Sequence, residues 1–123
     1  MSDLKILVVD DSPTMRRILL NTVQKAGFTS IEEAVDGKDA LAKLLAGEFE
    51  FLMTDWNMPN MSGLELVTAV RAEAKLAELP ILMVTTRNMK EDIVTAIKTG
   101  VNGYIVKPFD AKTLNAKIQD ILS

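Results

Sequence analysis

The chain has 123 residues, of which 48% are apolar and 25% are charged, values typical of one globular domain. It contains no Cys and no His, which excludes disulfides, the usual zinc sites and the catalytic triads that need either residue. The net charge of −3 argues against a broad nucleic-acid interface, and the apolar runs are too short to span a membrane. We therefore expect a soluble, cytoplasmic protein in which residues 1–123 form a single domain.

Short apolar runs alternate along the chain with longer patterns of helical spacing. The first, third and fourth runs are nearly continuous, as expected of parallel strands buried on both faces, whereas the second and fifth suit the edges of a sheet. The predicted strands lie at residues 4–9, 30–34, 51–53, 81–84 and 103–106. The predicted helices lie between and after them, around residues 15–23, 41–45, 66–70, 93–97 and 114–122.

Residues that start helices agree with this pattern. Ser12 and Pro13 suit the N-cap and first position of the first helix, and Asn88 with Glu91 resembles a capping box before the fourth. Five βα units in a row predict an α/β fold with a doubly wound, five-stranded parallel sheet and right-handed crossovers. Five strands in such a sheet suggest the order 2-1-3-4-5, which is the flavodoxin-like topology.

Polar residues follow four of the predicted strands. They are Asp10 and Asp11 after the first strand, Asp55 after the third, Thr85 after the fourth and Lys107 after the fifth. In the predicted order these four strands are neighbours, and ligands of open α/β sheets bind beyond the carboxyl ends of the strands. We therefore expect the five side chains to meet at one rim of the sheet.

Three clustered carboxylates repel one another and raise each other's pKa unless a cation joins them. Since the chain lacks His and Cys, we expect a hard, oxygen-preferring cation, and Mg²⁺ needs only one or two protein carboxylates. The alternative is that Asp10 and Asp11 only cap the first helix, which leaves Asp55 unexplained. A magnesium site is therefore the preferred interpretation.

A divalent cation, the Thr85 hydroxyl and the Lys107 ammonium together are typical of phosphoryl transfer, because metal and ammonium neutralise charge on the transferring oxygens. A Ser or Thr nucleophile would need a base, and the chain has no His to serve as one. A carboxylate can attack phosphorus itself and form an acyl phosphate. Asp55 is the candidate nucleophile, since Asp10 and Asp11 are needed for the metal.

At this point the residues resemble a known family. Asp10-Asp11, Asp55, Thr85 and Lys107-Pro108-Phe109 together resemble the signature of response-regulator receiver domains, and the resemblance covers the whole chain. Three segments resemble more narrowly the chemotaxis members of that family, at residues 12–17, 54–59 and 103–109. The resemblance implies a two-component signalling switch that consists of one receiver domain without an output domain, rather than an enzyme.

The resemblance also implies a role for each site residue. Asp55 is implied to accept the phosphoryl group from a phosphohistidine on a chemotaxis-type histidine kinase. Thr85 and Lys107 are implied to bind phosphoryl oxygens, and Tyr104 to turn inward as Thr85 moves. The domain is expected to catalyse its own phosphorylation and dephosphorylation. The implied Mg²⁺ ligands are three side chains and one backbone carbonyl, those of Asp10, Asp11, Asp55 and Asn57.

In this family the fourth helix, fifth strand and fifth helix form the output face. Residues 87–123 carry a net charge of +2 and residues 1–86 one of −5, so this face suits an acidic amphipathic helix. The implied partner is the flagellar motor switch protein. A phosphate sink or a regulator of another phosphorelay is the alternative, since Asn88 and Ile97 stand where chemotaxis regulators often carry smaller residues. The matching positions of the face are Lys90, Ile93, Ile97, Tyr104, Val106 and Lys117.

Two further positions bear on hydrolysis of the phosphoryl group. Arg87 lies two residues after Thr85, and Asn57 lies two residues after Asp55, positions that overlook the phosphoryl group in receiver domains. A guanidinium there can stabilise the phosphoryl oxygens and hinder water, although a solvent-exposed Arg without effect fits the sequence equally well. A dedicated phosphatase is a further partner that the family allows. We expect the chain to be a monomer.

Three other classes of protein compete with this interpretation. A flavodoxin-like cofactor-binding module is the more remote alternative, because the chain lacks the Gly-x-Gly-x-x-Gly and Walker patterns that cradle phosphates. A phosphatase of the haloacid-dehalogenase kind needs a second Asp where Asn57 stands. A binding-only pseudo-receiver is disfavoured by the complete set of acids, hydroxyl and Lys.

Overall fold

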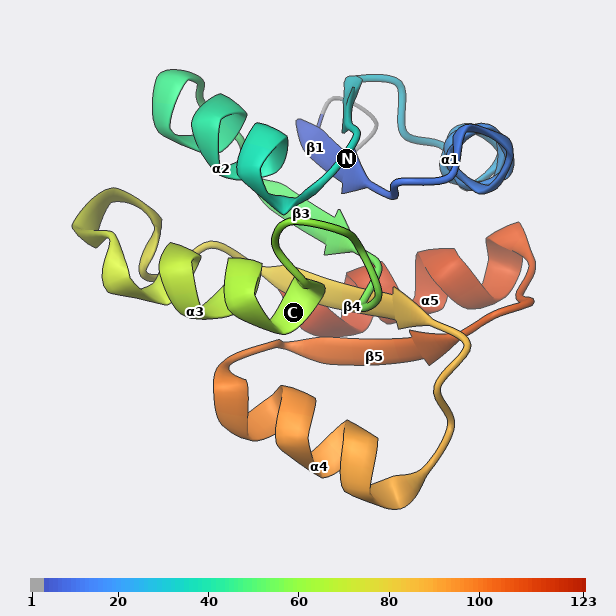
Figure 1. Cartoon of the computed structure of the whole chain (residues 1–123). Coiled ribbons are helices and arrows are strands. Elements are labelled where there is room, and N and C mark those ends of the chain that lie inside the picture. Colours follow the sequence, from blue (N-terminus) through green and yellow to red (C-terminus); the bar gives the residue numbers. More distant parts are fainter. Residues whose placement is uncertain (1–3) are drawn as a thin grey trace.

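Five parallel strands form one sheet in the order β2-β1-β3-β4-β5 in the computed structural model, which describes residues 4–123 (Figure 1). The strands are β1 (Ile6–Val9), β2 (Ile31–Ala34), β3 (Phe51–Thr54), β4 (Ile81–Thr85) and β5 (Gly103–Val106). The helices are α1 (Pro13–Lys25), α2 (Gly37–Ala46), α3 (Gly63–Ala72), α4 (Lys90–Thr99) and α5 (Ala111–Leu122), with a short 3-10 helix η1 (Ala74–Leu76) before β4. The predicted fold class and strand order are confirmed.

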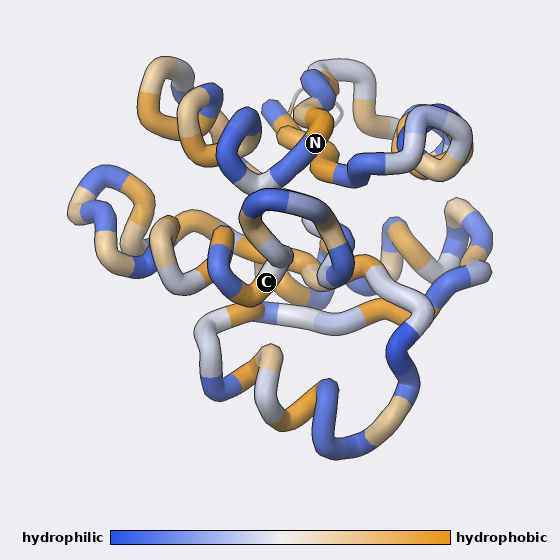
Figure 2. Tube along the Cα trace, in the orientation of Figure 1, coloured by the Kyte–Doolittle hydropathy of each residue, from blue (hydrophilic) through white to orange (hydrophobic). Residues whose placement is uncertain are grey.

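The sheet is covered on both faces, by α1 and α5 on one side and by α2, α3 and α4 on the other (Figure 1). Successive residues of β1 alternate between the two cores: Ile6 and Val8 pack with α1 and α5, whereas Leu7 and Val9 pack with the other three helices. Figure 2 shows hydrophobic and hydrophilic residues interleaved along the helices, as expected when one helix face is buried and the other meets water. Within residues 4–123, no helix is long and apolar enough to cross a membrane.

The helix starts agree with the prediction in one case and correct it in another. Ser12 caps α1, where its Oγ accepts a hydrogen bond from the Met15 amide at 3.3 Å, as predicted. The predicted capping box of Asn88 and Glu91 is wrong, because α4 begins one residue later with Met89 as an N-cap that accepts no side-chain hydrogen bond.

β5 spans its predicted range, whereas the other four strands differ from theirs by one or two residues at an end. β1 begins at Ile6 rather than at residue 4, and β2 begins at Ile31 rather than at residue 30. β3 and β4 each run one residue further than predicted, to Thr54 and Thr85. These threonines are fully buried, so the ladder continues through polar residues that the apolar pattern does not mark.

The pairing register sets where the polar residues emerge from the sheet. Val9 of β1 lies opposite Thr54 of β3, so the residues that follow, Asp10 and Asp55, leave the sheet at the same level. Thr85 of β4 lies opposite Val106 of β5, and the Lys107 amide donates to the Thr85 carbonyl at 2.8 Å. The register therefore brings the ends of four strands to one rim.

Arg71 ties the opposite end of the sheet together. Its guanidinium donates to the carbonyls of Leu79 at 2.7 Å and Gly100 at 2.8 Å, and to the Asn102 side chain at 2.9 Å. The same Asn102 oxygen accepts from the Ile81 amide at 2.8 Å, at the start of β4. One planar cation thereby joins the segments that precede β4 and β5 and fixes the edge from which both strands begin.

Candidate functional site: an acidic cluster at the sheet rim

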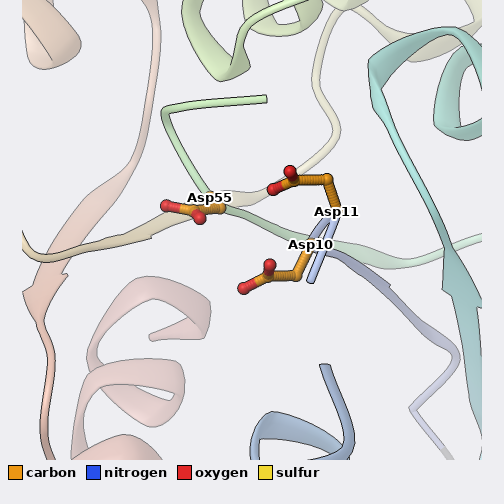
Figure 3. Close-up of side chains that lie close together, drawn as sticks. All are labelled: Asp10, Asp11 and Asp55. Atoms are coloured by element: carbon orange, nitrogen blue, oxygen red, sulfur yellow. The ribbon is translucent and has the colours of Figure 1, made fainter. Parts of the chain in front are cut away.

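The three predicted acids meet at the carboxyl ends of β1 and β3. Asp10, Asp11 and Asp55 each offer a carboxylate oxygen, and the three oxygens lie within 4.8 Å of one another (Figure 3). Asp10 is buried, Asp55 is half-buried and Asp11 is exposed, so the cluster opens toward solvent on one side. An all-oxygen set of this kind is the donor chemistry that Mg²⁺ prefers.

Lys107 is the cation that faces these acids. Its Nζ lies 3.1 Å from Asp10 Oδ2 and 3.5 Å from Asp55 Oδ2, and its side chain is only 10% exposed. The peptide bond from Lys107 to Pro108 is cis. One ammonium cannot neutralise three carboxylates, so the rim keeps an excess of negative charge.

The pKa of Asp55 reflects that excess of negative charge. Burial raises the pKa of the Asp55 carboxyl above its usual value of 3.8, and the neighbouring Asp10 raises it further, against the lowering effects of Lys107 and of a backbone hydrogen bond. That bond comes from the Trp56 amide, which donates to Asp55 Oδ1 at 2.7 Å. The negative charge of ionised Asp55 is therefore only partly balanced by Lys107 and the backbone hydrogen bond. An additional cation at the cluster would stabilise that charge.

The loop after β3 is held close to Asp55 by a glycine. The Gly63 amide donates to the Trp56 carbonyl at 2.7 Å, and a Cβ at residue 63 would lie 2.1 Å from the Asp55 carbonyl oxygen. Only Gly allows this approach of two backbones. The loop that carries Asn57 is thereby folded back over the start of α3. The sequence analysis did not single out Gly63, although its place after an N-cap Ser62 was visible.

The loop after β1 is held by Arg16. Its Nη1 donates to the Asp10 carbonyl at 2.8 Å, and its Nε donates to Glu33 at 2.6 Å. Asp10 Oδ1 accepts from the Ser12 amide at 3.0 Å, while Ser12 itself caps α1. Helix capping thus accounts for one oxygen of Asp10 and for none of the Asp11 or Asp55 oxygens. The sequence analysis did not identify Arg16, since nothing in the local pattern marks a side chain that binds a backbone carbonyl.

Thr85 and Tyr104 both contact Arg87 through its backbone. Thr85 is fully buried, and its Oγ1 accepts from the Arg87 amide at 3.2 Å. The Tyr104 hydroxyl donates to the Arg87 carbonyl at 2.9 Å, and the ring is only 8% exposed. Burial raises the pKa of the Tyr104 hydroxyl, and the nearby Asp92 carboxylate raises it further. Tyr104 is therefore turned inward in this structure, at the β5 position that the sequence places on the output face.

The Arg87 side chain packs against the β3–α3 loop. Its Nη2 donates to Asn57 Oδ1 at 2.9 Å, and its guanidinium carbon sits 4.4 Å from the centre of the Trp56 ring. Its Nη1 lies 3.5 Å from Asp92 Oδ1 in α4, and its Nε is buried without a hydrogen-bond partner. The two positions predicted to overlook the phosphoryl group are thus in direct contact with each other.

The predicted partner face is formed by α4, β5 and α5, which lie side by side (Figure 1). Lys90 and Ile97 are exposed, whereas Ile93, Val106 and Lys117 are half-buried. Two exposed apolar residues of this face were not predicted, Met89 at 58% and Val94 at 40% exposure. A shallow groove between β5 and α5 is lined by Val106 and Lys117 together with Tyr104, Ile105, Pro108, Phe109, Asp110 and Thr113.

Comparison with known proteins agrees with this geometry. The family model described as the response regulator receiver domain matches residues 6–119. The chemotaxis protein CheY of Pseudomonas aeruginosa is 52% identical over 118 residues, which are 96% of this chain and 95% of that protein. The chemotaxis protein CheY-3 of Vibrio cholerae is 50% identical over 119 residues, 97% of this chain and 92% of that protein.

Solved structures show the same architecture. The chemotaxis response regulator CheY4 of Vibrio cholerae superposes with a TM-score of 0.88 at 39% identity, covering 97% of this chain and 98% of that one. The response regulator TrrA of Thermotoga maritima, solved in complex with Mg²⁺ and beryllofluoride, gives 0.82 at 30% identity over 95% and 97%. Receiver domains bind Mg²⁺ at an acidic pocket, and the cluster of Asp10, Asp11 and Asp55 provides one here. The chain belongs to the response regulator receiver family and is a CheY-like receiver domain of a two-component system.

Proposed function

We propose that this chain is a phosphorylation switch in which Asp55 accepts a phosphoryl group, in the presence of Mg²⁺, from a phosphohistidine on a partner histidine kinase. The observation that carries the proposal is the acidic cluster with Lys107 at 3.1 Å and 3.5 Å from two of its members. The Thermotoga relative, solved with Mg²⁺ and a beryllofluoride group, supports it. The switch is proposed to act in the cytoplasm.

Each residue of the site has a separate role in the proposed phosphoryl transfer. An Asp55 carboxylate oxygen attacks phosphorus, the nitrogen–phosphorus bond of the donor breaks as the new oxygen–phosphorus bond forms, and the donor histidine leaves with its electron pair. Lys107 and Thr85 bind two of the phosphoryl oxygens, which spreads the developing charge. Asp10, Asp11, Asp55 and the Asn57 carbonyl would hold Mg²⁺, which would supply the positive charge that lets an anion approach three acids. Attack of water on phosphorus then breaks the oxygen–phosphorus bond to Asp55, which releases inorganic phosphate and restores the carboxylate.

Phosphorylation is proposed to change the face formed by α4, β5 and α5. The phosphoryl group brings a charge of about −1.5 to −2 to the rim and offers the Thr85 hydroxyl a strong acceptor. A shift of Thr85 disturbs the Arg87 backbone, to which both Thr85 and the Tyr104 hydroxyl are bonded. The output partner is proposed to be an acidic segment of the flagellar motor switch protein, in keeping with the chemotaxis relatives and the basic character of residues 87–123.

The proposal is tested by mass measurement of the intact protein after incubation with acetyl phosphate. We expect one added phosphoryl group in the wild type with Mg²⁺, none after chelation of the metal, and none in Asp55→Asn. The isosteric amide keeps the Trp56 contact but lacks the nucleophilic charge. A modified Asp55→Asn protein would place the acceptor elsewhere, and an unmodified wild type would contradict the function.

Removing one acid should stabilise the metal-free protein. Asp55→Asn is expected to raise the melting temperature at neutral pH, because the folded state raises the pKa of the Asp55 carboxyl above 3.8 and so disfavours its ionised form. The ionised carboxylate is the destabilised form, so the gain disappears as the pH falls through the raised pKa toward 3.8. Glu48→Gln, which removes an exposed acid before the start of β3, at the opposite end of that strand from Asp55, is the matched control for net charge.

Mg²⁺ should relieve the same repulsion among the carboxylates of the wild type. We expect Mg²⁺ to raise the melting temperature of the wild type, since a ligand of the folded state stabilises it, and to have little effect on Asp11→Ala. The metal-free Asp11→Ala protein should melt above the metal-free wild type. If Asp11→Ala instead melts lower without metal, the acid serves the local structure of the β1–α1 loop.

Arg87 is predicted to lengthen the lifetime of the aspartyl phosphate. Its guanidinium is bonded to Asn57 beside Asp55, within the region where phosphoryl oxygens and attacking water meet. We expect Arg87→Glu to shorten the lifetime several-fold and Arg87→Lys, which keeps the charge, to shorten it less. The decay of radiolabelled protein measures both, and identical lifetimes in all three proteins would remove Arg87 from the hydrolysis step.

A further inference from the structure

The first turn of α4 is held differently from that of the other helices. In the described part of the chain, α4 is the one α-helix whose N-cap residue, Met89, accepts no hydrogen bond with its side chain. The other four are capped by Ser12, Asp36, Ser62 and Asp110. A missing side-chain cap weakens the start of a helix relative to a capped one, so other contacts must hold the first turn of α4 in place.

Arg87 makes such a contact. It lies in the loop between β4 and α4, and its Nη1 is 3.5 Å from Asp92 Oδ1 in the first turn of the helix. The same guanidinium donates to Asn57 at 2.9 Å and covers the Trp56 ring at 4.4 Å. One side chain therefore touches both the loop that follows Asp55 and the first turn of α4.

The charges around Arg87 make this contact sensitive to events at Asp55. Its guanidinium is shared between a single carboxylate, that of Asp92, and the uncharged oxygen of Asn57, and its Nε donor is buried and unused. A phosphoryl group on Asp55 would introduce about two negative charges close to the same loop. Guanidinium groups bind phosphoryl oxygens strongly, often through two parallel hydrogen bonds. A phosphoryl dianion would thus compete with Asp92 for this cation.

We propose that Arg87 couples the state of Asp55 to α4: its guanidinium holds Asp92 before phosphorylation and turns to the phosphoryl oxygens afterwards, which frees the first turn of the helix. The inference rests on the function proposed above and adds the pair of residues through which the change reaches α4. Met89 and Ile97, which are 58% and 55% exposed, belong to the surface that this release would alter.

Amide hydrogen exchange at residues 93–96, followed by NMR in the full chain, tests the proposal. The Ile93 amide bonds to the Met89 carbonyl at 3.2 Å and so reports on the first turn. Asp92→Asn removes the partner of Arg87, and Glu91→Gln is the matched control, because Glu91 is an acid of the same turn with no side-chain partner among residues 4–123. Without ligand, we expect exchange in Asp92→Asn about two- to fivefold faster than in Glu91→Gln.

The second arm adds Mg²⁺ and beryllofluoride as a phosphoryl analogue. We expect exchange at residues 93–96 to accelerate in the wild type and in Glu91→Gln, and to stay unchanged in Asp92→Asn, where the turn is already free. In an Arg87→Met background, Asp92→Asn and Glu91→Gln should have equal effects. Both substitutions remove a negative charge near the N-terminus of α4, but only Asp92→Asn also removes the ion pair with Arg87. Comparing them with and without Arg87 therefore separates the effect of the ion pair from the effect of the lost charge.

Three results would overturn the coupling. Equal exchange in Asp92→Asn and Glu91→Gln without ligand would show that the pair does not hold α4. Beryllofluoride that protects the amides of residues 10–12 but leaves α4 unchanged would reject the coupling while the function stands. Absence of any response to Mg²⁺ and beryllofluoride, at residues 10–12 as well as in α4, would reject the proposed function and the coupling with it.

Discussion

The three carboxylates and one ammonium at the rim of the sheet set the electrostatic constraint on which the rest of the site depends. Lys107 contacts Asp10 and Asp55 but balances only one charge, and the pKa of Asp55 is raised in consequence of its burial and its neighbour. Such a rim attracts a divalent cation and, once the cation is bound, tolerates a phosphoryl group that it would otherwise repel. The parallel register enforces this crowding, because Val9 and Thr54 end their strands at the same level.

Direct hydrogen bonds hold the loops and strand ends around this rim, whereas the segment proposed to respond lacks one of the usual contacts at its start. Gly63 and Arg16 hold the two loops that carry the acids through direct backbone contacts, and Arg71 locks the opposite ends of β4 and β5. By contrast, α4 starts at Met89 without a side-chain cap. Precise geometry at the site and an uncapped helix start beside it are complementary in a switch, since elements that move are drawn from the less stable parts of a fold.

Much of this arrangement was predictable from the sequence because it follows from periodicity and topology. Continuous apolar runs indicated buried parallel strands, the strand order placed their ends together, and the residues after each strand then had to meet, as Asp10, Asp55 and Lys107 do. The ends of strands and helices were predicted less accurately. Thr54 and Thr85 are polar residues that continue their strands, and Asn88 lies one residue too early to cap α4. The contacts of Arg87 were not predictable, because they depend on the path of a loop that no repeating pattern describes.

The proposed switch rests on one claim: the acidic cluster binds Mg²⁺, and Asp55 then accepts a phosphoryl group. Trp56, the single tryptophan, adjoins Asp55 and lies under the Arg87 guanidinium, so its fluorescence should report both events. We would titrate Mg²⁺ and then add acetyl phosphate, in the wild type and in Asp55→Asn. Saturable Mg²⁺ quenching followed by a metal-dependent change that Asp55→Asn lacks is the predicted result. A folded wild type whose fluorescence responds to neither ligand would contradict the claim and leave a receiver-shaped binding module.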